Sequence, residues 1–127
     1  MCSTCSVILC SDKCFQMHRC SDSFWKDLQQ ESIQNEEFKK FIYQDEYCEL
    51  ALQSIDVRGE VKKEKHKNAT QIIRVESGRA NINGNVLEEN SVIVIPPGTE
   101  HIVKNAGKDI LKFSTVYAPA SNTLIIN

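Results

Sequence analysis

From Phe38 onward, apolar and polar residues alternate in short runs that are separated by turn signals. The alternation is clearest over residues 111–117, and the continuous apolar run Ser91–Ile95 indicates a buried strand. Asn-Gly-Asn at 83–85 and Pro-Pro-Gly at 96–98 are typical of tight turns. Many short strands at even spacing predict an all-β sandwich or closed barrel.

The predicted strands are Phe38–Tyr43, Tyr47–Ile55, Gln71–Val75, Ala80–Ile82, Val86–Leu87, Ser91–Ile95, His101–Lys104 and residues 111–117.

The N-terminal part of the chain has a different pattern. Residues 23–36 repeat apolar positions at helix spacing after candidate capping residues at 21–23. So short a helix is unstable alone, so we expect it to pack on the main body, with Trp25 as an anchor. Residues 1–22 are rich in Cys and Ser and have no periodicity. We therefore divide the chain into a Cys-rich leader (1–22), a helix (23–36) and a β-barrel domain (37–127).

Composition and charge narrow the class of protein. The chain has 127 residues, of which 41% are hydrophobic and 25% charged, which fits one folded domain with a short appendage. The net charge of −2 implies no strongly basic surface and so argues against nucleic-acid binding. No apolar run is long enough to span a membrane, and the N-terminus has no apolar signal segment. We therefore expect a cytoplasmic protein.

The cysteines are concentrated at the N-terminus. Five of the six lie in the first twenty residues, and clustered thiols in a reducing compartment suggest metal binding. One tetrahedral zinc ion could be bound by Cys2, Cys5, Cys14 and either Cys20 or His18. The alternative is a thiol-rich leader with no fixed structure.

Four residues form the candidate chemical site. Glu64 and His66 are two positions apart, so on a strand their side chains would share one face. Gln71 begins the next predicted strand, and His101 follows the Pro-Pro-Gly turn on another. Two imidazoles and a carboxylate can hold a divalent transition metal with open positions, and Gln71 could add a neutral amide oxygen. The alternative is a polar network filled with water.

Two stretches of the chain, 59–78 and 90–105, resemble the two motifs of the cupin family in the spacing of their Gly, His, Pro and Asn residues. Glu64 stands where the first motif usually has His, and Gln71 stands where it usually has Glu. This pattern is similar to a Glu-x-His…Gln variant of some small single-domain cupins. In the second motif Asn90 replaces Gly, a mild change because Asn tolerates the left-handed backbone.

The resemblance implies a small jelly-roll β-barrel with a metal at its centre. It assigns the ligand positions to Glu64, His66, Gln71 and His101. Two imidazoles, a carboxylate and an amide suit iron(II) or manganese(II) and do not exclude zinc or nickel, and the sequence does not choose among them. Many members of the family are homodimers, so a homodimer is expected. Their activities include dioxygenation and isomerisation of small molecules, and some members only bind a ligand.

Alternation also suggests which side chains would surround a bound molecule. Two sets of residues could line the barrel: those in phase with the predicted ligands, and those on the inner face of 111–117. The cavity would then be mainly apolar with a few polar groups. The candidate substrate-binding residues are then Ile73, Val103, Phe113, Thr115 and Tyr117. The alternative for each apolar residue is simple core packing.

Two functions stay open at this point. The first is a metal-dependent enzyme, a dioxygenase or isomerase of unknown substrate. The second is a non-catalytic cupin that binds a small ligand or serves as an assembly module, with a weakened or lost metal site. Gln71 favours the second, because a neutral amide attracts a dication less than a carboxylate does, whereas the complete His66, His101 and Glu64 set favours the first.

Overall fold

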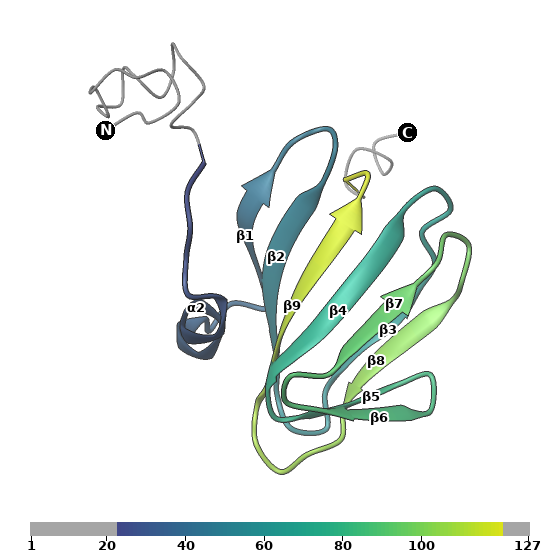
Figure 1. The fold of residues 1–127 in the computed structure, drawn as a ribbon. Coiled ribbons are helices and arrows are strands. Elements are labelled where there is room, and N and C mark those ends of the chain that lie inside the picture. The colour runs from purple at the N-terminus through teal and green to yellow at the C-terminus, as the bar shows by residue number, and fades with distance from the viewer. Residues whose placement is uncertain (1–22, 121–127) are drawn as a thin grey trace.

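The computed structural model describes residues 23–120 of the chain. That part of the protein consists of one short helix and nine strands, which Figure 1 labels. Their bounds are α2 Leu28–Gln34, β1 Lys39–Gln44, β2 Glu49–Ile55, β3 Glu60–Glu64, β4 Thr70–Ser77, β5 Arg79–Ile82, β6 Asn85–Glu88, β7 Val92–Ile95, β8 His101–Asn105 and β9 Leu111–Ala118.

The strands form two antiparallel sheets that enclose the core (Figure 1). The larger sheet has the order β1-β2-β9-β4-β7, and the smaller has the order β3-β8-β5-β6. The last strand, β9, lies between β2 and β4, so residues far apart in the sequence become direct neighbours. Apolar side chains of both sheets, such as Phe113 and Ile73 from one and Val103 and Ile82 from the other, form one hydrophobic core.

The inner face of the larger sheet changes in character along the strands. At one end Glu49 lies opposite Tyr117, which lies opposite Gln71. We call these three residues the polar row; all are buried. Farther along the same strands, inner positions such as Phe113 and Leu111 belong to the hydrophobic core. The alternation of β9 predicts this inner face correctly.

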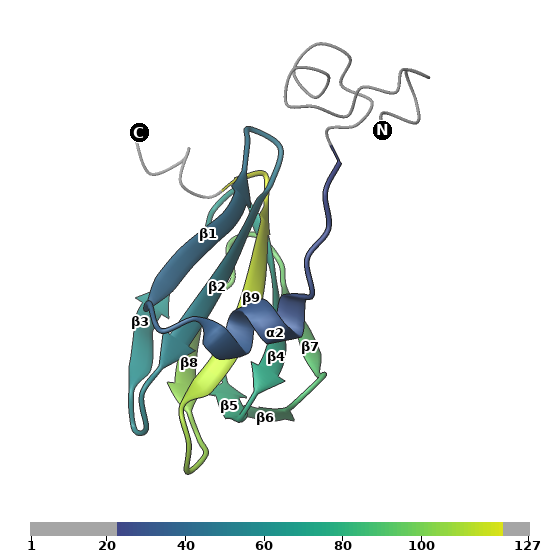
Figure 2. The same cartoon turned by 90° about the vertical axis from the view of Figure 1, so that its left-hand side faces the viewer.

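Helix α2 lies across the outer face of the larger sheet, over β2, β9 and β4 (Figure 2). Gln29 Nε2 donates to the Glu76 carbonyl of β4 at 3.0 Å, and Lys112 Nζ of β9 donates to the Asn35 carbonyl. These contacts explain how a helix of seven residues persists, and they agree with the expected packing on the main body. No helix within residues 23–120 has the length and apolar character needed to cross a membrane.

Two details of the N-terminal prediction are wrong. The helix is shorter than the expected 23–36, because Asp27 is its N-cap and accepts a hydrogen bond from the Gln30 amide. Trp25 therefore precedes the helix, and with 86% of its surface exposed it is no packing anchor. Helical spacing alone cannot show which of several polar residues caps the first turn.

The prediction of a buried strand at Ser91–Ile95 is also corrected by the structure. This segment was expected to be a buried strand, but β7 is the edge strand of the larger sheet. Val92 and Val94 are 54% and 55% exposed on the outer face, whereas Ile95 is buried. A run of β-branched residues fits an edge strand as well as a central one. The run alone does not show whether a strand lies at the edge of its sheet or whether its outer face is covered.

Candidate metal centre

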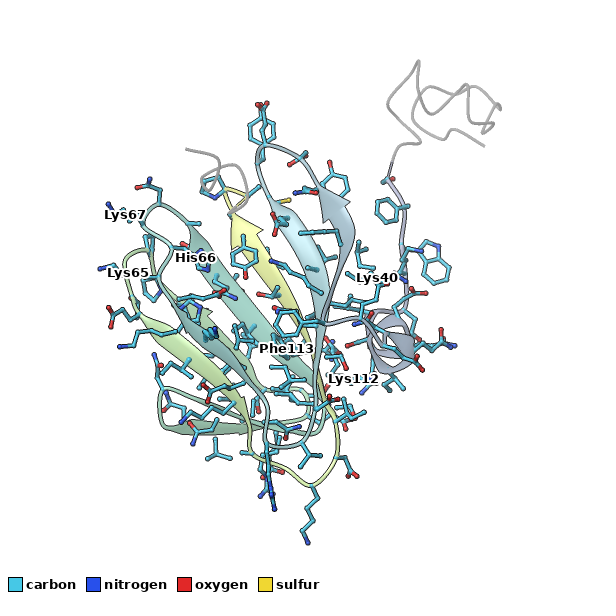
Figure 3. The ribbon with its side chains drawn as sticks, turned by 180° about the vertical axis from the view of Figure 1, so that it is seen from behind. Lys40, Lys65, His66, Lys67, Lys112 and Phe113 are labelled. Atoms are coloured by element: carbon cyan, nitrogen blue, oxygen red, sulfur yellow. The ribbon has the colours of Figure 1, made fainter. Side chains whose placement is uncertain are left out.

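The ends of two neighbouring strands bring the predicted metal ligands together. Glu64 is the last residue of β3 and lies opposite His101, the first residue of β8. His66 lies two residues beyond β3, so the prediction that it shares a strand with Glu64 is wrong. Its imidazole still faces the barrel, whereas Lys65 and Lys67 on either side point away (Figure 3). The alternation of side chains thus continues past the end of the strand.

Glu64, His66 and His101 form a compact group, which we call the ligand cluster. The Glu64 Oε1 atom lies 3.6 Å from Nε2 of His66 and 3.6 Å from Nε2 of His101. One potential ligand atom from each residue lies within 4.8 Å of the other two. Two donors that share a cation at about 2.1 Å each can lie up to roughly 4.2 Å apart, so each 3.6 Å separation fits one bound ion.

Three polar atoms of the site have no hydrogen-bond partner within the described part of the chain. His101 is only 1% exposed, yet its Nε2 atom has no hydrogen-bond partner among residues 23–120. The same is true of His66 Nε2 and of Gln71 Oε1. Buried polar atoms are nearly always paired, so orphaned ones call for an explanation. A cation bound between them supplies one.

The neighbour of His101 fixes which nitrogen is free to bind. Its Nδ1 atom lies 3.2 Å from the Thr99 carbonyl oxygen, which can only accept a hydrogen bond. Assigned from this contact, Nδ1 carries a proton, and Nε2, which lies 3.6 Å from Glu64 Oε1, is the nitrogen that can bind a metal. Metal-binding histidines commonly have their second nitrogen held by a carbonyl in this way.

Gln71 joins the cluster indirectly. Its Nε2 atom donates to Thr115 Oγ1 at 2.9 Å and to the Tyr117 hydroxyl at 3.1 Å. Both amide protons are therefore used, and within residues 23–120 the atom without a partner is the oxygen. The Tyr117 ring packs edge-on against the His66 ring, with 4.9 Å between their centroids. The structure thus gathers three of the four predicted ligands and ties the fourth to them through Tyr117.

The electrostatics of the site favour a bound cation. Contact with His101, then with His66, lowers the pKa of Glu64 to about 2, so its carboxylate is ionised at neutral pH. Burial, followed by the negative charges of Glu64 and Glu49, raises the pKa of Tyr117. The phenol therefore keeps its proton beside the cluster.

The candidate substrate-binding residues fall into two groups. Thr115 and Tyr117 hold the Gln71 carboxamide and so lie beside the site. Ile73, Val103 and Phe113 are buried members of the hydrophobic core. Their packing is established, and a role in binding stays a prediction.

Two charged residues of the barrel were missed by the sequence analysis. Glu49 is fully buried at the start of β2, and Lys39 Nζ lies 3.8 Å from its Oε2 atom. The signal was present, because Glu49 is in phase with Ala51 and Ile55 on a strand whose alternate residues face inward. An acidic residue at an inward position was the feature to notice.

The zinc-ligand prediction and one hollow concern other parts of the chain. The proposed zinc ligands Cys2, Cys5, Cys14, Cys20 and His18 fall outside the residues that the structure describes. A hollow of about 670 Å³ lies beside the segment that leads into α2, lined by residues such as Trp25, Tyr43 and Leu50. None of the four predicted ligands lines it.

Comparison with known proteins bears on the fold. The profile of the family described as "Cupin domain" matches residues 51–117. The chain is 33% identical over 104 residues to an uncharacterized protein of Acanthamoeba polyphaga mimivirus, and 31% identical over 100 residues to the uncharacterized protein YrkC of Bacillus subtilis. These alignments cover 76% and 70% of this chain but only 65% and 53% of the two relatives.

A solved structure extends this likeness to three dimensions. The crystal structure of a Bacillus halodurans protein matches with a TM-score of 0.73 and 25% identity, covering 82% of this chain and 94% of that one. Together with the strand content, this likeness confirms the predicted all-β jelly-roll fold.

Proposed function

We propose, because the chain belongs to the cupin family, that its barrel binds one divalent transition metal through Glu64, His66 and His101. The observation that carries this proposal is the state of the donor atoms. Nε2 of both histidines lacks a hydrogen-bond partner among the described residues, and an ionised carboxylate lies 3.6 Å from each. Gln71 Oε1 is the candidate fourth donor. These ligands suit iron(II) and manganese(II), and zinc and nickel accept them too.

The proposed activity is metal-dependent chemistry on a small molecule, of the dioxygenase or isomerase class. A metal held here would supply Lewis acidity to a molecule at its open positions. The chain itself would orient that molecule through the Tyr117 hydroxyl, which stays protonated because burial raises the pKa of the phenol. The hydrophobic core, including Ile73, Val103 and Phe113, would exclude water from the far side.

Metal content of the full-length protein tests the proposal. Manganese(II) is the suitable probe, because the thiolates of the leader prefer softer ions. We expect one equivalent in the wild type and a loss of at least 100-fold in affinity in Glu64→Gln, measured by metal titration and elemental analysis. Glu60→Gln makes the same change at an exposed position of β3 and should bind like the wild type. Absence of a manganese site in the wild type, or equal binding by both variants, would contradict the proposal.

A non-catalytic ligand-binding module is the second candidate, and Gln71 favours it. A carboxamide at this position removes one negative charge from the donor set, which weakens the attraction for a dication. The variant Gln71→Glu separates the two functions: it should gain metal affinity strongly if the natural site is a weakened one. Equal affinity of variant and wild type supports the metal-dependent function. The homodimer and the cytoplasmic location stay predictions.

A further inference from the structure

Glu49 is a buried carboxylate outside the ligand cluster. Its side chain is 0% exposed, and neither of its oxygens has a hydrogen-bond partner among residues 23–120. A desolvated carboxylate normally accepts several hydrogen bonds, because an unpaired charge in the interior is strongly unfavourable. The described part of the fold therefore leaves the acceptor capacity of this group unused.

A cation already lies beside this carboxylate. The Lys39 Nζ atom is 3.8 Å from Glu49 Oε2, which exceeds a hydrogen-bond distance. It also lies 4.9 Å from the centre of the Tyr117 ring and 5.2 Å from that of Phe41. A negative charge and two aromatic faces around one point are the chemistry that recognises an organic cation. Lys39 is 30% exposed, so its long side chain has a path to solvent that the buried Glu49 lacks.

This position lies within reach of the ligand cluster. Glu49 is directly opposite Tyr117 in the sheet, and Tyr117 is directly opposite Gln71. Neighbouring strands are about 4.8 Å apart, so the backbones at Glu49 and Gln71 are separated by roughly 10 Å. The Tyr117 ring contacts His66 of the cluster and also lies below the Lys39 ammonium. One small molecule could thus contact both ends of the polar row.

We propose that Glu49, Phe41 and Tyr117 bind the ammonium group of a small primary amine, and that the Lys39 ammonium fills this position until the amine displaces it. Amine binding is independent of the metal. The extension, in which a carboxylate at the other end of the molecule reaches the ligand cluster, rests on the proposed function.

The first experiment uses metal-free, full-length protein with butylammonium chloride as the probe. The readout is the midpoint of thermal unfolding, because a ligand that binds the folded state raises its stability. The reference sample contains sodium chloride at equal ionic strength and butan-1-ol, which has the same alkyl chain without the charge. We expect the amine, and not the alcohol, to stabilise the wild type. Glu49→Gln should abolish this effect, and Lys39→Met should raise the affinity for the amine about tenfold or more by removing the internal competitor.

The controls repeat these changes at exposed positions. Lys40→Met lies next to Lys39 on β1, and Glu60→Gln lies on β3; both should respond like the wild type. If Lys39→Met is too unstable to measure, the double variant Lys39→Met/Glu49→Gln restores the charge balance and should show no amine response. A response in Glu49→Gln equal to that of the wild type, or no gain in Lys39→Met over Lys40→Met, would overturn the proposal.

The second experiment tests the extension on manganese-loaded protein. The probes are ω-amino acids from 3-aminopropanoate to 6-aminohexanoate, each paired with the alkyl carboxylate of equal length. We expect at least one amino acid to bind about tenfold tighter than its partner, and Glu49→Gln to remove the difference. If manganese does not bind, the proposed function fails while the metal-free experiment still decides the amine site. If manganese binds and no amino acid is preferred, the extension is wrong.

Discussion

The same three central strands, β2, β9 and β4, form both ends of the barrel interior, yet one end is lined by polar side chains and the other by apolar ones. At one end, the polar row of Glu49, Tyr117 and Gln71 leaves several buried acceptor atoms unpaired among the described residues. At the other end, Phe113 and Leu111 pack among apolar side chains of the hydrophobic core, such as Val75 and Ile55. The apolar end therefore supplies stability, and the polar end depends on that stability to keep charged and polar groups in place.

The largest expected effect on stability is that of Phe113→Ala at the apolar end. Phe113 is among the largest fully buried side chains, so its removal should cost about 3–5 kcal/mol in the free energy of unfolding. Urea unfolding followed by circular dichroism measures the loss. Phe38→Ala removes the same group from an exposed position and should cost far less. If both variants lose the same amount, the core does not carry the stability assigned to it.

The next largest effect belongs to the polar end and requires metal. In His66→Ala, stabilisation of the protein by manganese(II) should disappear, since a 100-fold loss of affinity corresponds to about 2.7 kcal/mol of binding free energy. Unfolding without metal should change much less, because His66 is only partly buried. Thermal unfolding with manganese(II) measures the stabilisation by metal, and thermal unfolding with EDTA measures the stability of the metal-free protein. Lys65→Ala, a neighbouring exposed position, is the control, and a His66→Ala protein that manganese still stabilises would break the comparison.

Local patterns predicted the inner face of β9 and two residues of the candidate metal site. Alternation over 111–117 gave the inner face of β9, because a strand sends every second side chain to the same side. The two stretches that resemble the cupin motifs then placed Glu64 and His101 on adjacent strands. These features depend on residues that are close in the sequence or on a spacing that a known family shares.

The remaining features depend on the order of strands, which no local pattern contains. The pattern of Ser91–Ile95 predicts a buried strand, but β7 has a neighbour on one side only, and both of its valines, Val92 and Val94, are exposed. The buried position of Glu49 could be read from β2 alone, but its place beside Tyr117 could not, because Tyr117 is 68 positions away in the chain and directly opposite in the sheet. The packing of Lys39 over Tyr117 is long-range in the same way.

A smaller effect is expected where the two ends meet. Thr115 accepts a hydrogen bond from Gln71 Nε2, so Thr115→Val keeps the shape of the side chain and removes the acceptor. We expect a loss of about 1 kcal/mol in stability and roughly a tenfold loss in manganese affinity, because the Gln71 carboxamide is no longer held on both sides. Unfolding and metal titration provide the two readouts. Thr70→Val makes the same change on the opposite face of β4, and an equal effect there would show that the hydroxyl does not position Gln71.

The smallest effect is a pH dependence confined to the polar end. Contact with His101, then with His66, lowers the pKa of Glu64 to about 2, from 4.5 in an unfolded chain. A carboxylate with a lowered pKa stabilises the folded state above pH 4.5, and this contribution disappears as the pH falls from 4.5 through 2. In EDTA, urea unfolding of the wild type and Glu64→Gln should therefore converge over that range. The effect is small because Glu64 is 40% exposed and solvent screens its charge. Glu60→Gln should show no such convergence, and a constant difference between the wild type and Glu64→Gln at every pH would mean that the carboxylate is not held by the two imidazoles.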